Sequence, residues 1–185
     1  MDNRIFWQTI DEARTQAGNW EEMVEPLVDS LEQLDVSEIL LWQQIFNEYQ
    51  TLSYKSKLWA AAYIINGGCS DDGFDYFRAW LTAQGKNVFM ASLNDPEALA
   101  YLDSIESGCV EFEDIMGVAC DSYFKKLCID PDYDRFNNDM DKHPISDAQR
   151  AVISAEIKYA PDIDNEWDVD GLKQWLPILC ETCRW

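Results

Sequence analysis

The residues best suited to chemistry lie in one short stretch from Asn66 to Gly73, which we call the 66–73 loop. It combines several oxygen-bearing side chains with two adjacent glycines. Clustered carboxylate and amide oxygens suit a hard cation such as calcium or magnesium, and glycine lets a ligand approach the backbone. In this hypothesis the aspartates hold a cation or act as a general base. The candidate ligand-binding residues are Asn66, Gly67, Gly68, Ser70, Asp71, Asp72 and the more distant Arg78.

The same stretch has a structural interpretation, which the pattern favours. Residues 59–65 are apolar throughout and include three alanines, as expected for a helix buried on most sides. Two glycines would end that helix, and Ser70 or Asp71 would cap the next one. Arg78 would then pair with Asp71, with Asp75 or with a neighbouring helix. The aspartates would be a helix cap and a partner of the helix dipole.

Known cation and phosphate motifs do not match the loop. An EF-hand requires alternating acidic positions, a central glycine and a later glutamate, and this order is absent. No Gly-Lys-Ser/Thr follows the glycines, so the loop is not a Walker motif. Carboxylates also repel phosphate, so a phosphate-binding loop is not expected. The sequence therefore leaves a cation or small-ligand site and a tight interhelical turn as the two alternatives.

The central stretch also carries a resemblance to a known family. The matching pattern is Leu58-Trp59, Ala61-Ala62-Tyr63, the run from Asn66 to Phe74, Tyr76-Phe77-Arg78, Trp80-Leu81 and Gly85, with Phe6-Trp7, Ile10-Asp11-Glu12-Ala13 and Asp95-Pro96 outside it. On these residues the chain resembles an uncharacterised bacterial family, domain of unknown function 4240. Some of its members occur beside the tryptophan-glycine-arginine domain of molybdate-regulator-like proteins. The resemblance covers residues 1–105 and implies a mostly helical domain without implying an activity.

Hydrophobic periodicity predicts helices along the whole chain. The expected helices are 2–16, 19–34 (which either bends at Pro26 or begins there), 35–52, 59–65, 70–85, 86–93, 95–102, 110–127, 146–159 and 171–176. Ser107-Gly108 is expected to break the helical run. Strand signals are few. We therefore predict an all-α fold, a single domain over residues 1–185 built as a bundle of roughly eight helices. Residues 106–185 would be a helical C-terminal extension with acidic loops.

Two acidic segments interrupt the C-terminal part. Residues 128–143 are turn-rich and poorly periodic, so we expect a long solvated loop there. Their aspartate spacing is similar to that of a calcium loop, but the required glycine and glutamate are missing. Residues 162–170 form a second acidic loop, which carries Trp167.

Charge limits the possible partners. The chain has 35 acidic and 14 basic residues, giving a formal net charge of −21. Binding to nucleic acid or to anionic membranes depends on Lys and Arg, so neither is expected. An acidic surface would instead attract a basic protein partner. The first residues lack the pattern of a signal peptide and no run reaches the length of a membrane span, so we expect a cytoplasmic protein.

Cysteine and histidine do not suggest a cofactor. Six cysteines in a chain of this size fit a reducing compartment, where they remain thiols. Cys180 and Cys183 are spaced as a metal-binding pair, but a zinc site needs two more ligands and His143 is the only histidine. We assign no metal ligands and expect no cofactor. Histidine without an obvious serine or cysteine partner makes no catalytic set.

These observations leave function unknown but define hypotheses. The first is an acidic cytoplasmic interaction domain, regulatory or immunity-like in role, that binds a protein partner. The second is a metal-binding or small-ligand-binding domain, or an enzyme, that uses the 66–73 loop. A third is a passive domain that scaffolds an appended module. Whether the protein is an enzyme stays open.

Overall fold

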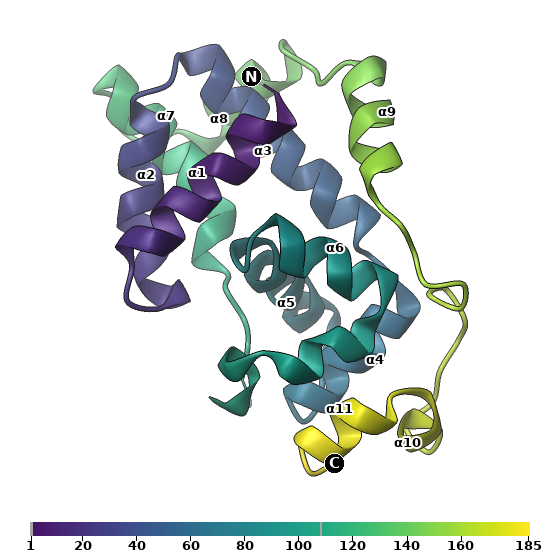
Figure 1. Cartoon of the computed structure of the whole chain (residues 1–185). Helices are drawn as coiled ribbons and strands as arrows, with labels where there is room; N and C mark the ends of the chain where they lie inside the picture. Colours follow the sequence, from purple (N-terminus) through teal and green to yellow (C-terminus); the bar gives the residue numbers. More distant parts are fainter. Residues whose placement is uncertain (1, 108) are drawn as a thin grey trace. The chain divides into compact units, whose positions relative to one another are not determined.

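Helices make up the computed structural model, which describes residues 2–107 and 109–185 (Figure 1). Within those residues the chain forms eleven α-helices, four short 3₁₀ helices and no strand. Nine of these α-helices have at least nine residues. The predicted all-α fold and its approximate helix number are therefore confirmed. Gly108, where we predict a break, lies outside the described residues. Among the helices described, none is long and apolar enough to cross a bilayer.

Contacts along the backbone divide the chain into two compact units, which we describe separately. Unit 1 comprises Met1–Tyr49 and Phe112–Ala155, and unit 2 comprises Gln50–Glu111 and Glu156–Trp185. Two of the three boundaries fall within helices, α3 and α9, each of which has residues in both units, and the third lies between Glu111 and Phe112 in a non-helical stretch. The expectation of one domain over residues 1–185 stays a prediction.

Unit 1 is built around an aromatic core. Its elements are α1 (Asn3–Gln16), η1 (Trp20–Met23), α2 (Val24–Glu32), most of α3 (Val36–Leu52), η4 (Asp114–Gly117), α7 (Val118–Leu127), α8 (Tyr133–Asp141) and most of α9 (Asp147–Glu156). Helix α2 packs against α1 and α7. The Trp7 indole donates a hydrogen bond to the Tyr49 hydroxyl at 3.0 Å, and the Trp42 indole donates one to Thr9 Oγ1 at 2.9 Å. The large rings are thus buried without leaving their N–H groups unpaired.

The prediction of a loop over residues 128–143 is wrong, because α8 occupies Tyr133–Asp141. Asp132 caps this helix, since its side chain accepts a hydrogen bond from the Arg135 amide at 3.1 Å. Phe136 is buried and packs edge-to-face on Tyr123, with ring centroids 5.4 Å apart. One buried aromatic residue in a polar segment is too weak a periodic signal to reveal a helix from sequence.

Residues 110–127 also differ from prediction, because the α-helix begins only at Val118. A 3₁₀ turn, η4, precedes it, and residues 110–113 are not helical. The expected helices over residues 95–102 and 146–159 also differ from the observed elements. The first is the 3₁₀ helix η2 (Pro96–Tyr101), and the second ends at Glu156. Pro26 lies in the first turn of α2, and the Asn19 cap opens the preceding 3₁₀ turn.

Gln44 on α3 holds the segment that links α8 to α9. Its amide nitrogen donates hydrogen bonds to the carbonyls of Met140, at 3.1 Å, and His143. Its amide oxygen accepts one from the Ile145 N–H at 2.6 Å. A single side chain therefore satisfies three backbone groups about a hundred residues away in the chain, which accounts for the order of a segment with few apolar residues.

Unit 2 contains the candidate site. Its elements are α4 (Ser56–Ile65), α5 (Asp71–Ala83), α6 (Lys86–Asn94), η2, η3 (Asp103–Ser107), α10 (Leu172–Trp175) and α11 (Pro177–Thr182). Helix α5 packs against α4 and α6, while α11 packs against α4 and η2. Phe74, Phe77 and Leu81 on α5 are fully buried, as their helical spacing predicts.

We predict that Gln44→Ala lowers the free energy of unfolding by about 1–3 kcal/mol, because the His143 carbonyl and the Ile145 N–H lose their partner and the Met140 carbonyl loses one of its donors. Hydrogen–deuterium exchange should rise in residues 140–146. Gln33→Ala is the control, since Gln33 is exposed and makes one long bond at 3.4 Å to the Asp29 carbonyl. Its effect should stay within about 0.5 kcal/mol. Unchanged exchange over residues 140–146 in Gln44→Ala would contradict this role.

Candidate functional site

The first half of the 66–73 loop ends helix α4. Asn66 is the C-cap, and Gly67 and Gly68 follow with φ angles of 68° and 135°. The Gly68 N–H donates to the Tyr63 carbonyl at 2.9 Å, and the Gly67 N–H donates to the Ile64 carbonyl at 3.4 Å. This is the Schellman pattern of a helix end, which requires residues that tolerate positive φ. The glycine pair is explained by the helix end itself.

The second half of the loop begins helix α5. The Ser70 hydroxyl accepts a hydrogen bond from the Gly73 N–H at 3.1 Å, as an N-cap does. Asp71 and Asp72 occupy the first turn, where negative charge is favourable beside the helix dipole. A Cβ at Gly73 would lie 3.1 Å from Glu111 Oε1 and 3.3 Å from Ser70 Oγ. Glycine at this position therefore lets the cap and the Glu111 side chain approach the helix.

Neighbouring side chains hold the loop from both sides. The Trp59 indole donates a hydrogen bond to the Cys69 carbonyl at 3.1 Å. Its ring also stacks on Phe74, with centroids 4.9 Å apart and an interplanar angle of 9°. Asn66 Oδ1 accepts a hydrogen bond from the Val110 N–H at 3.0 Å. This last contact joins the loop to the non-helical start of the 110–127 segment.

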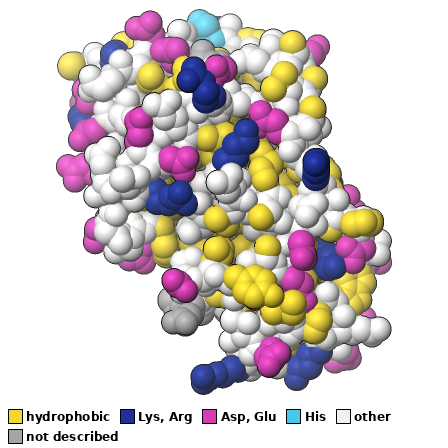
Figure 2. Space-filling view, viewed as in Figure 1, with side chains coloured by type: hydrophobic (Ala, Val, Ile, Leu, Met, Phe, Trp, Pro, Cys, Tyr) yellow, Lys and Arg dark blue, Asp and Glu magenta, His cyan; other side chains and the backbone are white. Residues whose placement is uncertain are grey.

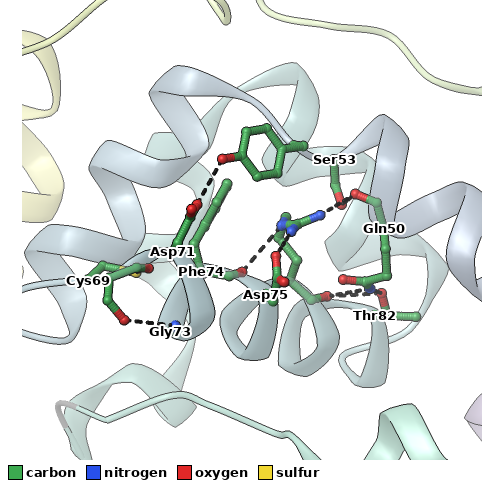
Figure 3. Close-up of polar contacts among 11 residues, drawn as sticks. Gln50, Ser53, Cys69, Asp71, Gly73, Phe74, Asp75 and Thr82 are labelled. Carbon is green, nitrogen blue, oxygen red and sulfur yellow. Dashed lines mark hydrogen bonds and ion pairs between the residues drawn. The ribbon is translucent and has the colours of Figure 1, made fainter.

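Arg78 is buried in a polar cluster, and Figure 3 shows three of its partners, Gln50, Phe74 and Asp75. The residue is only 5% exposed. Its guanidinium pairs with Asp75 and donates to the Gln50 carbonyl, and Nε donates to the Phe74 carbonyl at 3.3 Å. The guanidinium carbon also lies 4.8 Å from the ring centroids of both Tyr54 and Phe74. Carbonyls, a carboxylate and aromatic rings thus replace water around the cation.

The cluster reaches the loop through Tyr54. The Tyr54 hydroxyl donates a hydrogen bond to Asp71 Oδ1 at 2.9 Å, and this bond is the main cause of a raised pKa for Tyr54. Burial lowers the pKa of Arg78, and the neighbouring Asp75 carboxylate opposes that shift. Arg78 is therefore a buried structural cation, with its charge balanced by Asp75 and not presented to a ligand.

The structure thus distributes the predicted site residues between two roles. Asn66, Gly67, Gly68 and Ser70 form the helix end and the following cap, while Asp72 is exposed in the first turn. Asp71 and Arg78 are brought together through Tyr54. Sequence reasoning missed Tyr54 and Gln50, which lie 17 and 28 residues from their partners in the chain and belong to no motif.

The chemistry available in the loop is limited. The pKa of the Cys69 thiol is raised to about 12, mainly by burial and to a lesser extent by the nearby Glu111 carboxylate. A thiol with that pKa is a poor nucleophile near neutral pH. Across residues 2–107 and 109–185, no three carboxylate, thiol or imidazole side chains are grouped as ligands for a metal ion. The cation-binding hypothesis for this loop stays a prediction.

The fold and the site define an all-α protein with two capped central helices and a buried arginine. The chain belongs to the family described as a protein of unknown function, DUF4240, whose model matches residues 1–125. The predicted family resemblance is thereby confirmed. Comparisons with curated proteins and with solved structures gave no match.

We predict that Arg78→Met lowers the free energy of unfolding by about 2–4 kcal/mol, because charge-assisted hydrogen bonds are lost. Asp75→Asn should cost less, about 1–2 kcal/mol, since the Asp75 side chain is 46% exposed and the amide oxygen can still accept a hydrogen bond. Asp72→Asn, an exposed change in the same helix, should stay within about 0.5 kcal/mol. Urea unfolding measures all three. An Arg78→Met protein as stable as wild type would contradict the structural role.

Thiol reactivity gives an independent prediction. At pH 8 a thiol of pKa about 12 is ionised to about one part in ten thousand, so Cys69 should alkylate slowly. The exposed Cys128 should alkylate much faster. Timed labelling with iodoacetamide and peptide mass spectrometry compares them within one molecule. In guanidinium chloride the two rates should converge, because burial no longer disfavours the thiolate. Rapid native labelling of Cys69 would show that the loop opens.

Proposed function

We propose that the protein is an acidic interaction domain that binds a basic protein partner in the cytoplasm, in a regulatory or immunity-like role. The observation that carries this proposal is that most of the chain's own Lys and Arg side chains are already paired with carboxylates. At least nine of the 14 Lys and Arg side chains lie within 4.0 Å of a carboxylate. Carboxylates outnumber cations by more than two to one, so many remain to face a partner.

The distribution of these charges supports a protein partner. Figure 2 shows Asp and Glu side chains dispersed over the visible face, with hydrophobic side chains between them. A dispersed acidic surface with interspersed apolar groups suits a protein interface, where charge steers the encounter and apolar contacts add affinity. It disfavours nucleic acid, whose phosphates would be repelled.

The structure of the loop also supports binding over catalysis. Ser70 and the glycine pair are engaged in helix ends, and Arg78 is buried. The alternative is a metal site, a small-ligand site or an enzyme centred on the 66–73 loop. It retains the exposed Asp71 and Asp72 and the partly exposed Asn66 as accessible carboxylate and amide groups. It stays a prediction and is tested in the same experiment.

The test is affinity capture from an extract of the source cells at about 100 mM and about 500 mM salt, with mass spectrometry of the retained proteins. We expect a basic protein that binds stoichiometrically when purified and is released at the higher salt. An Asp71→Asn/Asp72→Asn variant, first shown to fold, should retain the same partner. A partner lost only in that variant would assign the interface to the loop. An empty wild-type lane, or a partner that is not basic, would contradict the proposal.

A further inference from the structure

Three aromatic rings from distant parts of unit 2 meet at its surface. Tyr63 on α4 packs against Trp167 in the loop before α10 and against Trp185 beyond α11, and all three residues are partly exposed. The Tyr63 centroid lies 5.3 Å from Trp167 and 5.4 Å from Trp185. The interplanar angles are 58° and 69°, so the rings are inclined to one another and are not stacked. We call this group the three-ring cluster.

Ion pairs anchor the loop that carries Trp167. Lys57 pairs with Asp162 at 2.7 Å, and the Lys57 N–H donates to the Ile163 carbonyl at 2.8 Å. Lys55 pairs with Asp164 at 2.9 Å. Lys55 is the N-cap of α4 and Lys57 lies in its first turn, so both lysines are about two turns before Tyr63. The position of Trp167 beside Tyr63 therefore follows from fixed contacts of the loop.

The surroundings of the cluster are acidic. Glu166, Asp168 and Asp170 flank Trp167 and are exposed, and Val169 among them is 49% exposed. Asp168 uses one oxygen to accept the Gly171 N–H at 2.8 Å. Residues 161–185 carry six acidic side chains against two basic ones, Lys173 and Arg184. An apolar surface with this rim attracts a cationic group more than a neutral one.

The chain already pairs cations with rings and carboxylates elsewhere in unit 2. Lys55 Nζ lies 4.6 Å from the Tyr159 ring centroid while it pairs with Asp164. Arg78 is held in the same manner by two rings and Asp75. A ring face attracts a cation through its quadrupole, and tryptophan does so most strongly. The three-ring cluster offers two tryptophans and nearby carboxylates. Among the residues that the structure describes, no Lys or Arg lies over its rings as Lys55 and Arg78 lie over theirs.

We infer that the three-ring cluster is the surface that receives an arginine or lysine side chain of the basic partner. This inference rests on the proposed function and names its contact site. The rings hold the cation and the aliphatic part of its side chain, and the acidic rim excludes anionic and favours basic segments. Interface energy is often concentrated in tryptophan and tyrosine side chains, and this cluster supplies both.

The test titrates a blocked peptide of alternating arginine and glycine, eight residues long, into the whole protein. We expect Trp167→Leu to raise the Kd about threefold to fivefold, because leucine keeps an apolar contact with Tyr63 but removes the ring face. Trp167→Tyr should restore most of the affinity. Tyr133→Ser is the control, since Tyr133 is a 67% exposed aromatic residue beside acidic residues in unit 1 and lies outside the cluster. It should bind as wild type does.

A second pair of variants separates local from overall charge. Glu166→Gln/Asp170→Asn and Asp134→Asn/Asp141→Asn both change the net charge by two, and all four side chains are exposed. Only the first pair should weaken binding of the peptide by more than the small effect expected from the change in net charge. The Trp167 indole N–H signal can be assigned in NMR spectra by its absence from the Trp167 variants. Its chemical shift should change when the peptide is added.

Distinct results contradict this inference and the proposed function. Equal affinities of wild type and Trp167→Leu, equal effects of the two charge pairs, or no detectable binding of the peptide would overturn the three-ring cluster as the cation site. The capture experiment would still support the proposed function if it returned a basic partner. Failure of that capture, with the peptide still bound at Trp167, would leave a cation-binding surface and remove the claim of a protein partner.

Discussion

The burial of the Arg78 guanidinium is the constraint on which the centre of unit 2 depends. A cation removed from water must find compensation, and here a carboxylate, two backbone carbonyls and two aromatic rings provide it. These partners come from α3, the link before α4, and α5. Their joint requirement fixes the end of α3 against α5 and places Tyr54 over the loop. In an acidic chain, this arginine is used to organise the fold.

The 66–73 loop illustrates how far the sequence could be interpreted. Its glycine pair, serine cap and flanking apolar helices were predictable because capping depends on local residues. The contacts of Tyr54 with Asp71 and of Gln50 with Arg78 were not, since they join residues distant in sequence and follow from packing. Helix α8 was missed for a different reason. Its single buried ring, Phe136, leaves almost no hydrophobic period to detect.

The candidate site therefore changes character between sequence and structure. Oxygen-rich side chains beside two glycines suggest ligand binding. In the structure, however, the two glycines end helix α4 and Ser70 caps helix α5. The surface features that sequence reasoning passed over, Tyr63 and Trp185 beside Trp167, are assembled only by the fold. Membership of the DUF4240 family brings no activity with it. The features that bear on function are on the surface: an excess of carboxylates, and inclined aromatic rings with carboxylates beside them.

Binding of a basic partner at the three-ring cluster is tested most directly by hydrogen–deuterium exchange of the protein alone and of the protein saturated with its purified, captured partner. We expect new protection in residues 160–171 and in the second half of α4 around Tyr63, with little change in the 66–73 loop. Protection confined to the 66–73 loop would contradict it and would return that loop to the centre of function.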